Sequence, residues 1–284
     1  MIAAGLAIDE SRTARRAAPG ATKVTAMRLY TAIAVALGVA FALLGTFTAV
    51  LAASNPTPPA ELTPGDSSTF NESQYGLQPL EAIAGNITAI TIYGISQTKS
   101  WQGYYGNITA TITLDDASNY TFYNWSSAEP RGQIYATLNT SIDWDGVTCF
   151  NFSNDSAAFH LTIENYYGIN APDVDGVNET YTATDHPAFQ VGSRTMSDCP
   201  TTYIFRDDAA QTADFVNVLL FDPLLNDTGW IYTTLIENRS TTTGNPQDLT
   251  CYNGQPCDFQ ILVNENGHGT DTLTTTYYFW VELL

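Results

Sequence analysis

The feature that most constrains the fold is a long uncharged stretch near the N-terminus. Residues 29–53 read LYTAIAVALGVAFALLGTFTAVLAA and contain no charged side chain. At a rise of about 1.5 Å per residue, a helix of this length spans the roughly 30 Å hydrocarbon core of a bilayer. A helix buried in a globular domain is seldom apolar on every face for so long. The sequence therefore predicts a single N-terminal transmembrane helix over residues 29–53.

Charge on either side of this run predicts its orientation. Five basic residues stand against two acidic ones before it, whereas five stand against 27 acidic ones after it. Because basic flanks stay on the cytoplasmic side, residues 1–28 are expected inside the cell and the rest of the chain outside. A body this acidic repels nucleic acid, which excludes nucleic-acid binding.

Two other interpretations of the apolar run stay open. If Met27 is the true start, the run is the core of a secretory signal peptide, and Ala52, Ala53 and Ser54 supply the small residues of a cleavage site. The run is longer than an ordinary signal-peptide core, which favours a retained anchor. A pilin-type leader is the third interpretation. With a retained anchor the body is exported as part of a single-pass membrane protein, and with a cleaved signal peptide it is exported as a secreted protein.

The chain beyond the run divides into two parts. Residues 54–80 are rich in Pro, Ser and Thr, which is typical of an extended, poorly packed stalk. Residues 81–284 carry the strand-like patterns and form the expected extracellular domain.

Acceptor sequons for N-glycosylation, Asn-x-Ser/Thr, are frequent, and all of them follow the apolar run. This placement agrees with a body outside the cell, where glycosylation occurs. The eleven sequon asparagines are Asn71, Asn86, Asn107, Asn119, Asn124, Asn139, Asn151, Asn154, Asn178, Asn226 and Asn238.

All four cysteines also follow the run, which in an exported domain predicts two disulfides. Three connectivities are open. The turn-forming residues between Cys251 and Cys257 favour a bond between these two, which leaves Cys149 with Cys199. A metal clip at Cys251 and Cys257 is the alternative, although no familiar zinc spacing completes it.

Short alternating segments beyond residue 80 predict a mostly β fold. Asn107–Leu114, a turn at Asp115–Ser118 and Asn119–Trp125 together predict a hairpin. One helix is expected over Asp155–Tyr167, ending at Gly168. The economical arrangement is an immunoglobulin-like β-sandwich of two packed sheets with one helix in a crossover. The further expected strands are 87–95, 133–138, 147–152, 215–221, 230–237, 259–263 and 272–283.

The sequence shows no catalytic signature. There is no Gly-x-Ser-x-Gly elbow, no phosphate-binding glycine loop and no HExxH, so a non-enzymatic protein without a cofactor is expected. A structural calcium ion is the exception, because Asp173, Asp175, Asn178 and Glu179 place oxygen ligands in one loop. The calcium pattern is incomplete, and Asp-x-Asp-Gly is also ordinary turn chemistry. The three histidines are expected at the surface or on a helix.

Aromatic clusters have two interpretations. Three clusters, Trp101–Tyr105, Tyr120–Trp125 and Tyr277–Trp280, would serve as a platform for a carbohydrate, whereas packing inside a β-sandwich explains the same residues. The apolar strand at the C-terminus would accept a strand from a neighbouring subunit if its edge is open.

Four stretches resemble a domain of archaeal cell-surface proteins whose function is uncharacterised. They are WQGYYGNITATITLDDASNYTFYNW (residues 101–125), YYGINAPDVDGVNETY (166–181), DFQILVNENG (258–267) and TYYFWVEL (276–283). The resemblance covers roughly residues 81–284 and implies archaeal origin and surface exposure. It implies no catalytic or binding residue.

Together these features predict a glycosylated archaeal surface protein with a structural or adhesive role. Its expected partners are the membrane, other surface proteins, glycans or copies of itself. Two alternatives are a filament subunit that assembles by strand addition and a carbohydrate-binding or sugar-processing surface domain.

Overall fold

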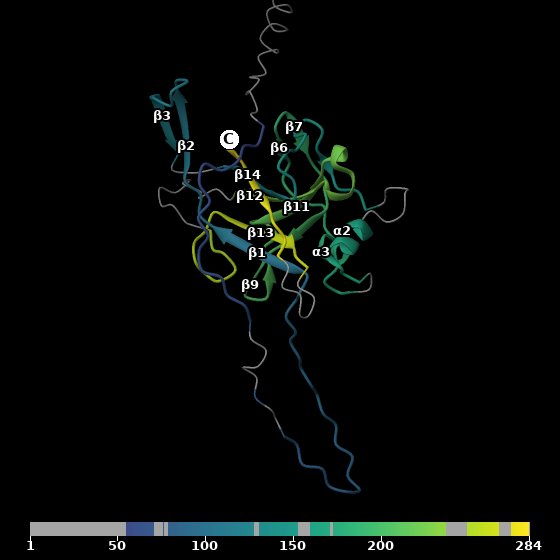
Figure 1. Cartoon of the computed structure of the whole chain (residues 1–284). Coiled ribbons are helices and arrows are strands. Elements are labelled where there is room, and N and C mark those ends of the chain that lie inside the picture. The colour runs from purple at the N-terminus through teal and green to yellow at the C-terminus, as the bar shows by residue number, and fades with distance from the viewer. Residues whose placement is uncertain are drawn as a thin grey trace, which may run out of the picture. The chain divides into compact units, whose positions relative to one another are not determined.

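The fold is mostly β and antiparallel (Figure 1). The computed structural model describes residues 55–70, 76, 79–127, 131–152, 160–170, 173–236, 249–266 and 274–283. Residues 1–28 and the apolar run 29–53 lie outside these ranges. Among the described residues, no helix combines the length and the apolar character needed to cross a membrane.

A six-stranded antiparallel sheet forms the centre of the domain. Its strands run in the order β14-β4-β12-β11-β5, and β8 also pairs with β11. Their bounds are β4 Gly132–Thr137, β5 Thr148–Cys149, β8 Thr201–Tyr203, β11 Val216–Phe221, β12 Trp230–Ile236 and β14 Tyr278–Leu283.

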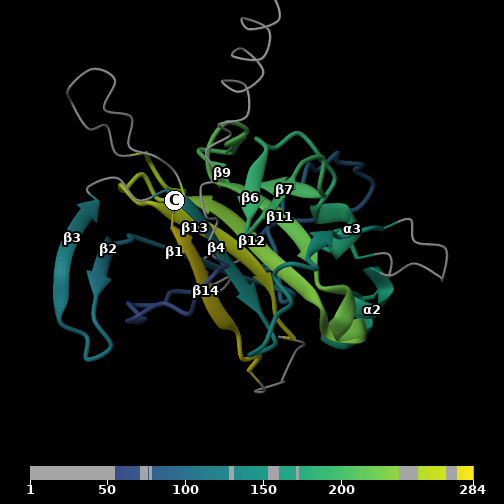
Figure 2. The same ribbon diagram turned by 90° about the horizontal axis from the view of Figure 1, so that it is seen from above.

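Smaller elements surround the central sheet (Figure 2). Three further antiparallel pairs are β1 (Trp101–Gly106) with β13 (Phe259–Asn264), β6 (Phe189–Val191) with β7 (Arg194–Met196), and β9 (Phe205–Arg206) with β10 (Ala209–Ala210). The helical segments are α2 (His160–Tyr167), α3 (Val177–Thr180) and the 3-10 segment η2 (Pro223–Thr228).

Both faces of the central sheet are covered, which explains why β4 and β12 are buried along almost their whole length. On one face, Trp230 and Tyr232 pack with Ile163 of α2 and Ile261 of β13. On the other face lie alternate sheet residues such as Tyr135, Val218 and Ile231, together with Phe189 of β6, Met196 of β7 and Trp144. Side chains alternate between faces along a strand, so a strand that is buried along its length contributes to both cores.

Glycine is required at the start of β4. Gly132 has φ +131°, and a Cβ atom there would lie 1.8 Å from the backbone oxygen of Glu282 in β14. Residues with a side chain rarely adopt this conformation. The close approach of β4 and β14 therefore depends on this glycine.

The hairpin predicted from the sequence is confirmed. Strands β2 (Ala110–Asp115) and β3 (Thr121–Ser127) pair antiparallel. The side chain of Asp116 closes the turn, because its Oδ1 accepts hydrogen bonds from the backbone N–H groups of Ser118 (2.8 Å) and Tyr120 (2.9 Å). Asn119 follows with φ +63°, a conformation that asparagine tolerates.

Several expected elements differ from the structure. Residues 87–95 form no strand and are exposed throughout. The expected strand 147–152 shrinks to Thr148–Cys149, and the last strand begins at Tyr278. Helix α2 ends before Gly168 as predicted (φ +68°), whereas the expected helix start lies outside the described residues. Strands β1 and β6 to β10 and helix α3 were not predicted, because all but β1 are only two to four residues long.

Candidate functional site

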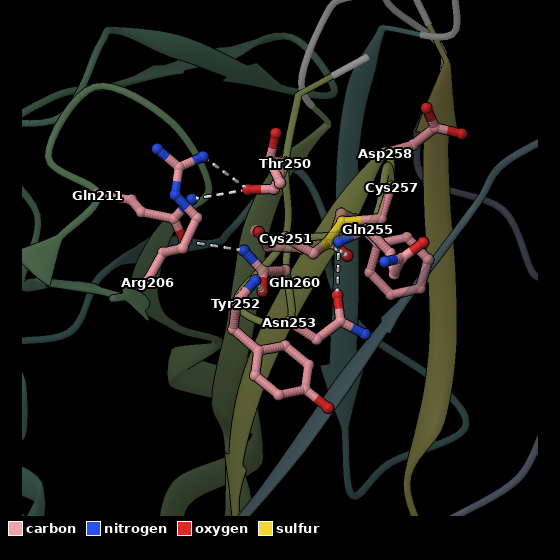
Figure 3. Close-up of a disulfide and its surroundings, with 12 residues drawn as sticks. Arg206, Gln211, Thr250, Cys251, Tyr252, Asn253, Gln255, Cys257, Asp258 and Gln260 are labelled. Atoms are coloured by element: carbon pink, nitrogen blue, oxygen red, sulfur yellow. Dashed lines mark hydrogen bonds between the residues drawn. A yellow bond between two sulfur atoms is a disulfide. The ribbon is translucent and has the colours of Figure 1, made fainter. Parts of the chain in front are cut away.

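The predicted pairing of the cysteines is confirmed. Cys251 bonds to Cys257 around a tight turn, in which the Cys251 N–H donates to the Gln255 carbonyl (2.9 Å) and Gly254 has φ +77°. Arg206 and Gln211 both donate to the Thr250 carbonyl, at 3.4 and 2.9 Å (Figure 3). The disulfide thus fixes the segment that leads into β13.

The second disulfide joins Cys149 of β5 to Cys199, 50 residues later. It connects two segments that both border β11, since β5 and β8 pair with different parts of that strand. His186 lies beside it: Nε2 accepts a hydrogen bond from the Cys199 N–H (3.0 Å), and Nδ1 lies 2.8 Å from the Pro187 carbonyl. His186 is buried, so the expectation of a surface histidine was wrong at this position.

The expected calcium loop forms a turn followed by α3. The carboxylate of Asp173 accepts hydrogen bonds from the backbone and side chain of Asn170, at 3.0 and 3.2 Å. Asp175 binds Thr98 with its carboxylate, and its carbonyl accepts a 2.6 Å hydrogen bond from Trp101 Nε1. In the described part of the chain, no three His, Cys, Asp or Glu side chains come close enough together to hold a metal ion. Calcium binding here stays a prediction.

Eight of the eleven sequon asparagines lie among the described residues; Asn71, Asn154 and Asn238 lie outside them. Of these eight, Asn139 alone is half-buried, and its Nδ2 donates a 2.7 Å hydrogen bond to the Thr228 carbonyl. The other seven are exposed, namely Asn86, Asn107, Asn119, Asn124, Asn151, Asn178 and Asn226.

The two tryptophans that the sequence singled out lie in different environments. Trp101 is half-buried and packs on the main core, with ring centroids 6.2 Å from Tyr181 and 6.5 Å from Tyr232. Trp125 of β3 is about half exposed and lies 4.6 Å from the ring of Tyr123. Core packing therefore explains Trp101, and the exposed pair Tyr123–Trp125 is the part that a ligand could reach.

A buried carboxylate was missed by the sequence analysis. Glu282 of β14 is only 1% exposed. Its Oε2 accepts a 2.7 Å hydrogen bond from the Tyr135 hydroxyl, and its Oε1 accepts a 3.0 Å hydrogen bond from the Gly192 N–H. Burial raises the pKa of Glu282, and the two hydrogen bonds partly oppose this rise. Its position in an alternating strand was the available signal, because Glu282 follows Trp280 on the same face.

The edge of the central sheet is covered at one point. Thr57 and Val281 of β14 exchange two backbone hydrogen bonds of 3.0 and 2.8 Å. In an antiparallel pair every second residue bonds to the neighbouring strand, so the next position on one side of Thr57 is Pro59, which has no N–H to donate and limits the pairing in that direction. The first described residues of the expected stalk therefore lie on the domain.

Comparison of the chain with protein-family models, with curated proteins and with solved structures finds no match.

Proposed function

We propose that this chain is a non-enzymatic, N-glycosylated protein of an archaeal cell surface, with a structural or adhesive role. In this proposal the run 29–53 anchors the chain in the cell membrane, and an acidic β-sandwich domain lies outside. In this proposal the β1–β13 pair, which packs on the central sheet through Ile261 and Val263, is the second layer of the sandwich.

The observation that carries the proposal is the exposure of seven of the eight described sequon asparagines. Transfer of a glycan requires a reachable side-chain amide, and these seven are reachable. The two disulfides support the same setting, because disulfides persist in oxidising compartments outside the cytosol.

Glycopeptide mass spectrometry of the chain from its native cells tests the proposal. We expect glycans at most of the seven exposed sequons. Asn139 is an internal control, because its amide is engaged with Thr228 and should carry little or no glycan. A second arm treats intact cells with protease, which should remove the domain. Unmodified sequons together with a protected domain would rule the proposal out.

A filament subunit is a second candidate, favoured by the position of β14 at the edge of the central sheet. A strand that adds there must first displace Thr57, which is hydrogen-bonded to the backbone of Val281. Electron microscopy of the intact surface layer and of the purified chain would distinguish the two functions. Monomers at high concentration would exclude the filament.

Carbohydrate binding is a third candidate, favoured by the exposed Tyr123–Trp125 pair. Aromatic faces of this kind stack on sugar rings. A glycan array with wild type and Trp125→Ala tests it, and loss of a signal in the variant supports binding through this pair. Trp101→Ala is unsuitable as a binding probe because Trp101 packs on the core.

A further inference from the structure

The segment Ile87–Ile95 exposes an unusual amount of apolar surface. Ile87 is fully exposed, Ile92 and Tyr93 are each 86% exposed, and Ile90 is 61% exposed. Every residue from 79 to 96 is exposed, and Figure 1 shows this part of the chain extending well away from the sheets. Exposed apolar patches of this kind typically mark an interaction site.

The alternation within the segment is that of a strand covered on both faces. In an extended chain, Ile90 and Ile92 would lie on one face, and Ile87, Tyr93 and Ile95 on the other. Strands that are apolar on both faces occur where both faces are covered. Within the described residues, the segment has no strand partner.

The same chain contains a near copy of this segment that does have a partner. Residues 86–92 read NITAITI, and residues 107–114 read NITATITL. The last five residues of the second stretch, 110–114, belong to β2, which pairs with β3; residues 107–109 precede the strand. A sequence of this kind is therefore compatible with pairing to β3 in this protein.

The hairpin β2–β3 presents a complementary apolar face. Ile112 lies opposite Trp125, and Leu114 lies opposite Tyr123. All four side chains are between 45% and 54% exposed, and both views show the hairpin standing to one side of the central sheet (Figures 1 and 2). The described part of the chain pairs no strand with the outer edge of β3. A two-stranded hairpin is marginal in water, and a third strand stabilises it.

The absence of charge, and the position of the Asn124 sequon, leave the outer edge of β3 open to a second copy. Residues 82–98 and 117–127 carry no charged side chain, whereas the rest of the domain is strongly acidic and repels its like. The sequon residue Asn124 points to the face opposite Tyr123 and Trp125, because neighbouring residues in a strand alternate. A glycan on Asn124 would leave the apolar face bare.

We propose that Ile87–Ile95 of one copy adds as a third strand to the outer edge of β3 in a second copy of this chain. The added strand extends the apolar face of Ile112, Leu114, Tyr123 and Trp125. This inference deepens the proposed function, since it names the partner of a structural surface protein. A reciprocal exchange closes a dimer, and a one-way exchange builds a chain of subunits.

Cross-linking of two differently tagged full-length copies in the same cells tests the proposal. One copy carries Thr91→Cys and the other carries Asn124→Cys, so that a short thiol cross-linker joins only neighbouring strands. We expect a product that contains both tags. The double variant Ile90→Asp/Ile92→Asp should lower the yield at least about tenfold, since it places charge on the added strand.

Two controls keep the result interpretable. Val174→Asp places a charge at a 92% exposed apolar residue far from both strands in sequence, and it should leave the yield unchanged. The Ile90→Asp/Ile92→Asp variant should keep the wild-type melting temperature, because these side chains belong to no described core cluster. A yield unaffected by the aspartates, or no two-tag product, would overturn the proposal. Glycosylation and surface exposure are measured separately, so failure here leaves the proposed function standing.

Discussion

At the scale of single residues, buried polar side chains connect segments that are distant in the sequence. Asn217 of β11 is fully buried, and its side-chain amide forms hydrogen bonds with backbone groups as a neighbouring strand would. Its Nδ2 donates to the carbonyls of Phe215 (3.0 Å) and Gln260 (2.9 Å), and its Oδ1 accepts from the Leu262 N–H (2.8 Å). One side chain thus links the central sheet to β13.

We expect Asn217→Leu to lower the free energy of unfolding by about 2–4 kcal/mol, because it leaves buried backbone groups without partners. Urea unfolding of the unglycosylated domain measures this loss. Asn124→Leu, at an exposed strand position, is the matched control and should change stability by less than about 0.5 kcal/mol. Equal effects of the two substitutions would contradict the assigned role of Asn217.

Glu282 makes the stability depend on pH in a defined direction. Burial raises its pKa in the folded state above the ordinary value of 4.5, so the unfolded chain releases this proton first. Stability from this residue is therefore fully present below about pH 4.5 and is lost as the pH rises through the raised folded pKa. We expect Glu282→Gln to remove this loss, because the amide can accept from the Gly192 N–H and donate to the Tyr135 hydroxyl oxygen.

Melting temperatures of wild type and Glu282→Gln across pH 4 to 8 check this prediction. As the pH rises, the melting temperature of wild type should fall relative to that of Glu282→Gln. Tyr135→Phe is the comparison: it removes a hydrogen bond to the buried carboxylate and should cost about 1–3 kcal/mol near neutral pH. A constant gap over the pH range would show that Glu282 titrates normally in the folded protein.

At the scale of elements, the two disulfides differ in the length of chain that they close. Cys149–Cys199 closes 50 residues, and Cys251–Cys257 closes six. The entropy removed from the unfolded chain grows with the logarithm of loop length. The long-loop disulfide should therefore stabilise the domain more than the short one.

Replacing Cys149 and Cys199 by serine should cost about 2 kcal/mol more than replacing Cys251 and Cys257, from the ratio of the two loop lengths. Urea unfolding of the two double variants gives the difference directly. A larger loss in the Cys251/Cys257 variant would mean that the turn beside β13 folds only when this disulfide is closed.

At the scale of the whole molecule, negative charge dominates. The chain has 29 acidic and 10 basic side chains. Among the described residues, the pair Arg206–Asp207 is an exposed contact of 3.9 Å, which contributes little. Acidic side chains therefore repel one another over the surface, and this repulsion destabilises the compact state.

We expect the melting temperature of the domain to rise as NaCl increases from about 10 to about 150 mM, because the screening length falls from roughly 30 to roughly 8 Å. Scanning calorimetry at fixed pH measures the rise. An equal concentration of a neutral osmolyte serves as the control for effects unrelated to charge. A melting temperature that falls over this range would mean that attractive ion pairs outweigh the repulsion.

Local chemistry determined several features from the sequence alone. The turn residues between Cys251 and Cys257 indicated their disulfide, and Asp116 and its neighbours predicted the β2–β3 turn. Segments rich in Thr, Tyr, Ile and Val between turn residues placed the central strands. In each case the residues that determine the local structure lie close together in the sequence, so the sequence alone is sufficient to predict it.

Only the tertiary structure decided the rest. Ile87–Ile95 has the composition of a strand and yet finds no partner in the described chain, because pairing depends on a second strand elsewhere. Trp101 and Trp125 look equivalent in sequence, but β1 packs Trp101 against the core while the hairpin exposes Trp125. Burial of Glu282 and His186 likewise arises from contacts across 90 and 13 residues, which no local pattern specifies.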